Sequence, residues 1–243
     1  ISLPAIIFNV AENNSVYAII SGDYSYELID EDTITILNYS GSEKNLVIPE
    51  KIDKKTVKKI GYGAFAECKS IESLVIPETV TTIDNYAFSQ CSQLQTMTIP
   101  DSVVSLGQNA FAGCSSLESL KIPSEIKAIS YGAFFDCTSL KSVEIPDGVQ
   151  TISGMVFGNC KSLENIILPN TITSIGGNAF SDCTGLKSIN LPNGVKVLGS
   201  GAFKGCLGLE EVMLPDTLTS IGQSAFQDCI SLESIAIPNS VTG

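Results

Sequence analysis

The stretch from Gly176 to Pro192 reads GGNAFSDCTGLKSINLP, and close copies of it recur along most of the chain. The copies keep a fixed period, because each of the eight cysteines lies 23 residues from the next: Cys68, Cys91, Cys114, Cys137, Cys160, Cys183, Cys206 and Cys229. A period of about 20 to 50 residues is typical of stacked-repeat proteins. The cysteines therefore mark one position of a repeated unit, rather than a disulfide framework or a metal cluster.

Each unit places apolar residues at the same distances from its cysteine. Phe stands three residues before the cysteine, and Ala stands four before it in every unit except the one that carries Val156. After the cysteine, aliphatic residues alternate up to a Pro, which predicts a short strand that the Pro ends. The spacing of Ala and Cys predicts a short helix with Ala, Phe and Cys on one face. Because a single unit cannot bury its own apolar face, we expect the stacked units to share a continuous core.

The string Ile-Gly-x-x-Ala-Phe-x-x-Cys-x-Ser-Leu-x-Ser-Ile-x-Ile-Pro-x-x-Val resembles the BspA-type leucine-rich repeat found on bacterial and some protist cell surfaces. The resemblance covers about residues 49–243. It implies an α/β fold, a right-handed leucine-rich-repeat solenoid with parallel strands on its concave face and short helices on its convex face. It also implies an extracellular or cell-surface location and adhesion to host or matrix proteins. Pro occupies the place where the general leucine-rich pattern carries Asn or Cys, so no ladder of Asn side chains is expected.

Residues 1–48 do not repeat, and we interpret them as an N-terminal β-rich cap on a solenoid that spans 49–243. Two β-rich runs, Tyr24–Ile29 and Thr33–Tyr39, flank an acidic turn and predict a β-hairpin. A cap would cover the first exposed strand edge of the stack. The first unit carries five extra residues in a lysine-rich stretch. These lysines could contact an acidic glycan or a membrane surface, or simply face solvent. Polar residues interrupt the apolar parts of 1–20, so we predict no membrane span there, and no basic region marks a signal peptide. Both ends of the sequence look trimmed, in that it lacks an initial Met and stops in the middle of a repeat.

The composition excludes several function classes. The net charge is −12, and all fourteen basic residues are Lys. Without Arg, bidentate readout of phosphate or guanine by guanidinium is not available. The chain has no His, which removes Ser-His and Cys-His pairs and His metal ligands. We therefore predict a protein that is not an enzyme, with no catalytic residue, cofactor, metal site or nucleic-acid partner.

The predicted strands leave two columns of side chains in solvent. The column five residues past each cysteine is nearly uniform and small, which suits packing between neighbouring strands. The column seven residues past each cysteine varies: Val75, Thr98, Lys121, Glu144, Ile167, Asn190, Met213 and Ala236. Varied chemistry on a regular scaffold is what a recognition surface would show, and an unconstrained column would show it equally well. This column is the candidate binding face.

A second candidate contact lies toward the C-terminal end. The residue after the cysteine is polar in six units but apolar in the last two, as Leu207 and Ile230. This pair indicates end-to-end self-association or contact with a following segment, and simple exposure is the alternative. We predict that the cysteines are free thiols, because equivalent side chains point the same way and disulfides need converging Cβ atoms.

Two functions remain for this chain. The first is a non-catalytic protein-binding or adhesion module, displayed on or secreted from a cell, whose partner is a host or neighbouring-cell protein or glycoprotein. The second is a structural spacer or targeting arm of a larger surface protein whose active domain lies elsewhere.

Overall fold

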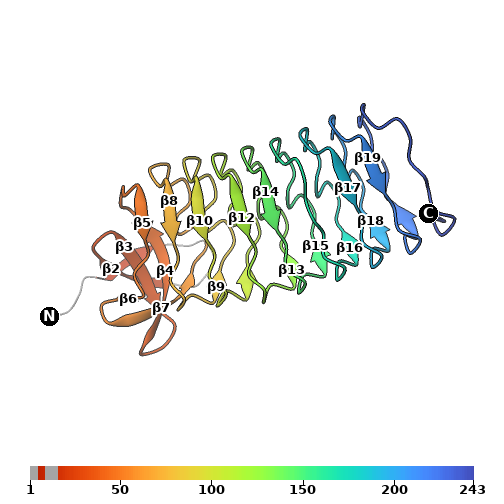
Figure 1. Cartoon of the computed structure of the whole chain (residues 1–243). Helices are drawn as coiled ribbons and strands as arrows, with labels where there is room; N and C mark the ends of the chain where they lie inside the picture. The colour runs from red at the N-terminus through yellow and green to blue at the C-terminus, as the bar shows by residue number, and fades with distance from the viewer. Residues whose placement is uncertain (1–4, 9–15) are drawn as a thin grey trace.

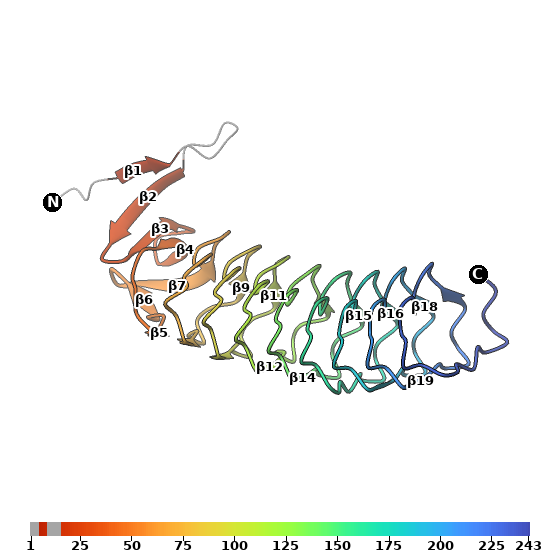
Figure 2. The same cartoon turned by 90° about the horizontal axis from the view of Figure 1, so that it is seen from above.

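The 23-residue period corresponds to one coil of a β-solenoid in the computed structural model, which describes residues 5–8 and 16–243 (Figure 1). Most coils contribute one short strand to each of two rows of parallel strands. The coils stack side by side from the N-terminal cap to the C-terminal end of the chain (Figure 2).

The first strand row is the one that the sequence predicts, directly before each Pro. Its strands, the upper arrows in Figure 1, are β5 (Asn45–Val47), β8 (Ser73–Val75), β10 (Thr96–Thr98), β12 (Ser119–Lys121), β14 (Ser142–Glu144), β17 (Ser188–Asn190) and β19 (Glu211–Met213). Register is set by the repeat, so that Leu120 pairs with Val143 and Ile189 with Val212. The row is divided into the groups β5–β8–β10, β12–β14 and β17–β19. The parallel strands are thus confirmed, whereas the curvature of their face and the hand of the coil stay predictions.

The second strand row follows the Pro and is not predicted from the sequence. Its strands are β7 (Lys55–Ile60), β9 (Thr82–Ile83), β11 (Ser105–Leu106), β13 (Ala128–Ile129), β15 (Thr151–Ile152), β16 (Ser174–Ile175), β18 (Val197–Leu198) and β20 (Ser220–Ile221). Most are only two residues long, too short to show an alternating pattern. They pair in parallel as β7–β9–β11 and β13–β15–β16–β18–β20.

The prediction of a short helix over each Ala-Phe-x-x-Cys segment is wrong, because no coil in the described residues contains a helix. In their place each coil makes tight turns with left-handed backbone at two positions, five residues and one residue before the cysteine, as at Asn178 (φ 54°) and Asp182 (φ 57°). A left-handed residue in every fourth place interrupts a right-handed helix. The amide groups bond across coils instead: the N–H of Phe88 donates to the carbonyl of Ala110 at 2.7 Å.

The core is a spine of stacked phenylalanines, one from each coil. Consecutive ring centroids lie 5.0 to 5.9 Å apart, with interplanar angles of 2° to 19°. Beside the spine, seven cysteine thiols donate to the carbonyl oxygen of the Phe in the preceding coil, with Sγ–O distances of 3.0 to 3.4 Å. The Ala, Phe and Cys side chains therefore share a buried side as predicted, although turns and not a helix place them there.

The N-terminal part is an antiparallel unit made of β1 (Ala5–Phe8), β2 (Val16–Ser21), β3 (Tyr24–Leu28) and β4 (Thr33–Tyr39). The expected hairpin is present as β3 and β4, and β1 and β2 project beyond the coil stack (Figure 2). β4 pairs in parallel with β7. Tyr39 extends the aromatic spine, because its ring centroid lies 5.2 Å from that of Phe65. Residues 1–4 and 9–15 of the predicted cap lie outside the described residues, and the division at 48/49 stays a prediction.

The five extra residues of the first unit form a hairpin of β6 (Lys51–Ile52) with β7. Its two turn residues, Asp53 and Lys54, both have left-handed backbone. The carboxylate of Asp53 accepts hydrogen bonds from Ser21 Oγ at 2.8 Å and from Tyr26 Oη at 2.9 Å. These bonds tie the inserted hairpin to the N-terminal unit.

Candidate functional site

The candidate binding face lies on the outer side of the first strand row. In β12 the middle residue Leu120 is buried, and the flanking Ser119 and Lys121 are exposed. The same alternation exposes all eight residues of the predicted column. Three of them expose large apolar side chains: Val75 (50% exposed), Ile167 (84%) and Met213 (55%). Side chains of this kind at such exposure offer contact area to a partner.

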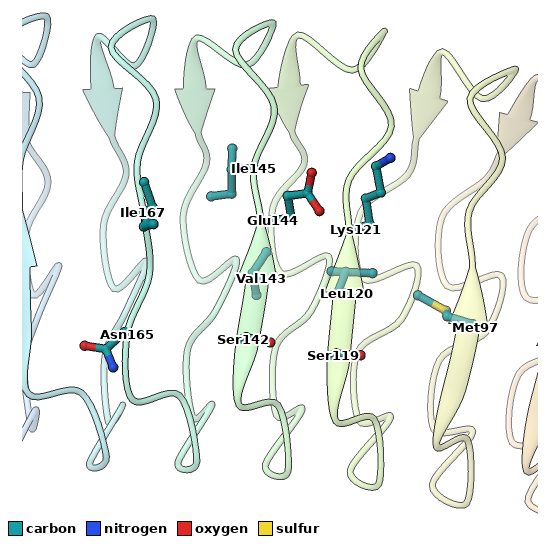
Figure 3. A pocket seen from close by; sticks show the side chains of 10 residues that line it. All are labelled: Met97, Ser119, Leu120, Lys121, Ser142, Val143, Glu144, Ile145, Asn165 and Ile167. Carbon is teal, nitrogen blue, oxygen red and sulfur yellow. The ribbon is translucent and has the colours of Figure 1, made fainter.

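A groove of about 660 Å³ lies in the middle of this face. Its lining combines three members of the predicted column (Lys121, Glu144, Ile167), three of the small polar column (Ser119, Ser142, Asn165) and the apolar side chains of Met97, Leu120, Val143 and Ile145 (Figure 3). The structure thus brings together only the central members of the predicted face, while Val75, Thr98, Asn190, Met213 and Ala236 do not line the groove.

The groove lies where the first strand row is interrupted. Within the described residues β10 and β12 are not hydrogen-bonded to each other, and one isolated bridge, Glu144 to Ile167, follows β14. Because the ladder is open before β12 and is reduced to a single bridge after β14, the face can hollow there. Met97 is not among the predicted site residues, and its only signal in the sequence is that a flexible Met replaces the Leu, Ile or Val found at this inward position in the other units.

The groove carries one positive and one negative side chain that face solvent. Lys121 and Glu144 are register partners on β12 and β14, yet no ion pair joins them in the part of the chain that the structure describes. Three positions earlier in the same two coils, Lys141 Nζ does pair with Glu118 at 2.9 Å. Lys121 and Glu144 therefore remain available for charges on a partner.

The cysteines do not form a reactive site. All eight are free, and seven are buried. Burial raises the pKa of the thiols of Cys91, Cys137 and Cys206 to about 12, because desolvation disfavours the thiolate. A neutral buried thiol is a poor nucleophile and a poor metal ligand. Among the described residues no group of three or more Cys, Asp or Glu is placed to hold a metal ion.

The other regions singled out from the sequence lie apart from the groove. Lys59 of the lysine-rich hairpin pairs with Asp84 at 2.8 Å, and Lys55 Nζ bonds the carbonyl of Glu31. Leu207 and Ile230 are exposed, by 42% and 78%. Their contact with another copy or segment stays a prediction.

The chain is similar to bacterial leucine-rich repeat proteins in both sequence and structure. The model of the BspA type leucine rich repeat region matches residues 38–164 and 151–243, in six copies. The crystal structure of a leucine rich repeat protein of T. pallidum is similar with a TM-score of 0.62 and 32% identity, over 88% of this chain and 89% of that one. The pneumococcal vaccine antigen PcpA shares the fold, with a TM-score of 0.60 and 22% identity over 92% of this chain and 71% of that one. No curated protein matches the sequence. The described residues contain no helix with the length and apolarity that crossing a bilayer requires.

Proposed function

Since this chain belongs to the BspA-type leucine-rich repeat family, we propose that it is a non-catalytic protein-binding or adhesion module that is displayed on a cell or secreted. Leucine-rich repeat proteins of this kind are typically surface or protein-interaction modules and are generally not enzymes. The observation that carries the proposal is the groove over β12–β14, which joins exposed apolar side chains to two unpaired opposite charges on a regular scaffold.

The groove selects a kind of partner by its chemistry. Ile167 and Met97 provide apolar anchoring area, which contributes most of the free energy at the centre of an interface. Lys121 and Glu144 at the side of this area favour a segment that carries an acid and a base close together. An amphipathic, extended segment of a host or neighbouring-cell protein or glycoprotein satisfies both conditions.

The test is a binding screen of the whole chain against extracellular matrix proteins and mucins, followed by variants of the groove. Ile167→Asp is expected to weaken binding at least tenfold, which corresponds to about 1.4 kcal/mol. Val104→Asp is the matched control, because Val104 is also exposed (58%) but lies outside the groove. Reversal of both charges, Lys121→Glu with Glu144→Lys, should recover part of the affinity that each single reversal loses.

The alternative function predicts a different result. A structural spacer or targeting arm needs no ligand on this face, so no member of the panel would bind through it. Binding that Ile167→Asp and Val104→Asp leave equally strong would also contradict the groove as the site.

A further inference from the structure

The turn edge of the solenoid is a second surface with its own chemistry. We define it as the residues six and five positions before each cysteine, two per coil, where the Ala-Phe turn begins. Across the eight coils none of these sixteen residues is charged, in a chain with forty charged residues. Tyr62, Tyr86 and Tyr131 lie on this edge, whereas the last three coils carry only Gly, Asn, Ser and Gln there.

The tyrosines of the turn edge are exposed and ordered by their neighbours. Tyr62 is 68% exposed, Tyr86 40% and Tyr131 45%. The rings of Tyr62 and Tyr86 lie 5.5 Å apart at an angle of 57°. The ring of Tyr131 lies over Gly154, where a Cβ atom would come within 3.2 Å of it, and its hydroxyl is 2.7 Å from Met155 Sδ. Aromatic side chains held in this way offer contact area at little cost in conformational entropy.

Two large side chains of the turn edge stand at positions where the backbone is left-handed. Tyr86 has a φ of 58° and Met155 a φ of 57°. In the equivalent position five of the other six coils carry Gly or Asn, as at Gly132 and Asn178, which tolerate left-handed backbone far better, and the last coil carries the small Ser224. The coil therefore does not need Tyr or Met there, and folding alone would favour their replacement. Strained positions that retain bulky residues are typical of surfaces with a separate role.

Between the tyrosines lie amide groups that are free to bind. Asn85 Oδ1 accepts the backbone N–H of Gln108 at 2.7 Å, and the Asn85 Nδ2 donor has no partner among the described residues. The exposed side-chain amide of Gln108 has no hydrogen-bond partner among the described residues. The surface thus alternates aromatic faces with amide donors and acceptors, one coil apart, at a spacing of about 4.8 Å.

We propose that the turn edge from Tyr62 to Met155 binds an extended, uncharged oligosaccharide. Aromatic rings cover the C–H faces of sugar rings, and amides donate to and accept from sugar hydroxyls. A charged ligand would lose hydration without finding an opposite charge on this row. The regular spacing lets successive sugar units contact successive coils. This site is distinct from the groove on the first strand row and does not depend on a protein partner of that groove.

The experiment is calorimetric titration of the whole chain with neutral hexasaccharides: β-1,3-glucose, β-1,4-glucose, α-1,6-mannose and β-1,4-N-acetylglucosamine. A chondroitin sulfate hexasaccharide is the charged control. Because the chain has seven Tyr and no Trp, its intrinsic fluorescence reports directly on tyrosine contacts. We expect at least one neutral sugar to bind and the charged sugar not to bind.

Two variants separate binding from structure. Tyr86→Gly copies the residue of three other coils, so the thermal midpoint should not fall, while affinity for the bound sugar falls at least tenfold. Tyr62→Ala should weaken it similarly, and Val104→Ala should leave it unchanged. The proposal is overturned if no neutral sugar binds, or if binding persists unchanged in both tyrosine variants. It is equally overturned if these variants weaken binding to a protein of the matrix panel instead, because the edge would then be a protein interface.

Discussion

Phe134 is the residue whose removal tests the stacked core most directly. Its side chain is fully buried, and its ring stacks on Phe111 at 5.7 Å and on Phe157 at 5.9 Å. Truncation of a buried Phe to Ala costs about 3–5 kcal/mol, and each stacked pair contributes about 0.5–1.5 kcal/mol beyond its buried area. Because Phe134 loses two such pairs, we expect Phe134→Ala to lower the free energy of unfolding by about 5 kcal/mol, the upper end of the range.

Urea denaturation followed by far-ultraviolet circular dichroism measures this loss, and Phe135 provides the control. Phe135 is the next residue but lies only partly buried outside the spine, so Phe135→Ala should cost about 1 kcal/mol. Phe134→Leu keeps much of the volume and removes both stacked pairs, so its cost should fall between the two. If Phe134→Ala lowers the free energy of unfolding no more than Phe135→Ala does, the stacked rings do not stabilise the core as described.

Two further predictions concern the thiols and the cap. Folding raises the pKa of Cys137 to about 12 from its ordinary 9.0, so the stability that the neutral thiols contribute is fully present below pH 9 and declines as the pH rises toward 12. Urea titrations between pH 8 and 12 should show this decline, with a smaller slope in Cys137→Ala, and an equal slope in both proteins would contradict it. Asp53→Ala removes the acceptor of Tyr26 Oη and should cost about 1–3 kcal/mol in thermal or urea unfolding. Asp53→Asn keeps an acceptor and tolerates the left-handed turn, so a cost as large as that of Asp53→Ala would exclude this hydrogen bond as the cause.

The buried and exposed faces of each unit could be predicted from the sequence, because the pattern of burial repeats every 23 residues. Phe134 and Cys137 are fully buried in the predicted register, and Leu120 and Val143 face inward on the predicted strands. All eight residues of the candidate binding face are exposed, as the strand alternation predicts, while their role in binding stays a prediction.

The features that depend on backbone dihedrals could not be predicted in the same way. The spacing of Ala and Cys, four residues apart, fits a short helix and a pair of tight turns equally well. Only the left-handed φ of residues such as Asn159 and Asp182 decides between the two structures. The groove escaped prediction because it arises where β10 and β12 fail to pair, a relation between coils that no single unit records. Tyr86 and Met155 appear ordinary in the sequence, and their backbone conformation alone marks them as exceptional.

The direction of the hydrogen bonds between coils has a consequence for assembly. At the turn, the N–H groups of Gly63, Phe65 and Glu67 all donate toward the following coil. On the opposite side, the N–H groups of Thr81 and Asp84 donate toward the preceding coil. At the turns each coil therefore has one donor side and one acceptor side, whereas the first strand row donates in both directions, as from Ile122 to Glu144 and from Gln95 to Glu72. Two copies placed head to head would set N–H against N–H at the turns, so the turns favour copies that stack through their coils head to tail. Such a contact is heterologous, and unless its rotation closes a ring it lengthens into a filament rather than ending as a symmetric dimer.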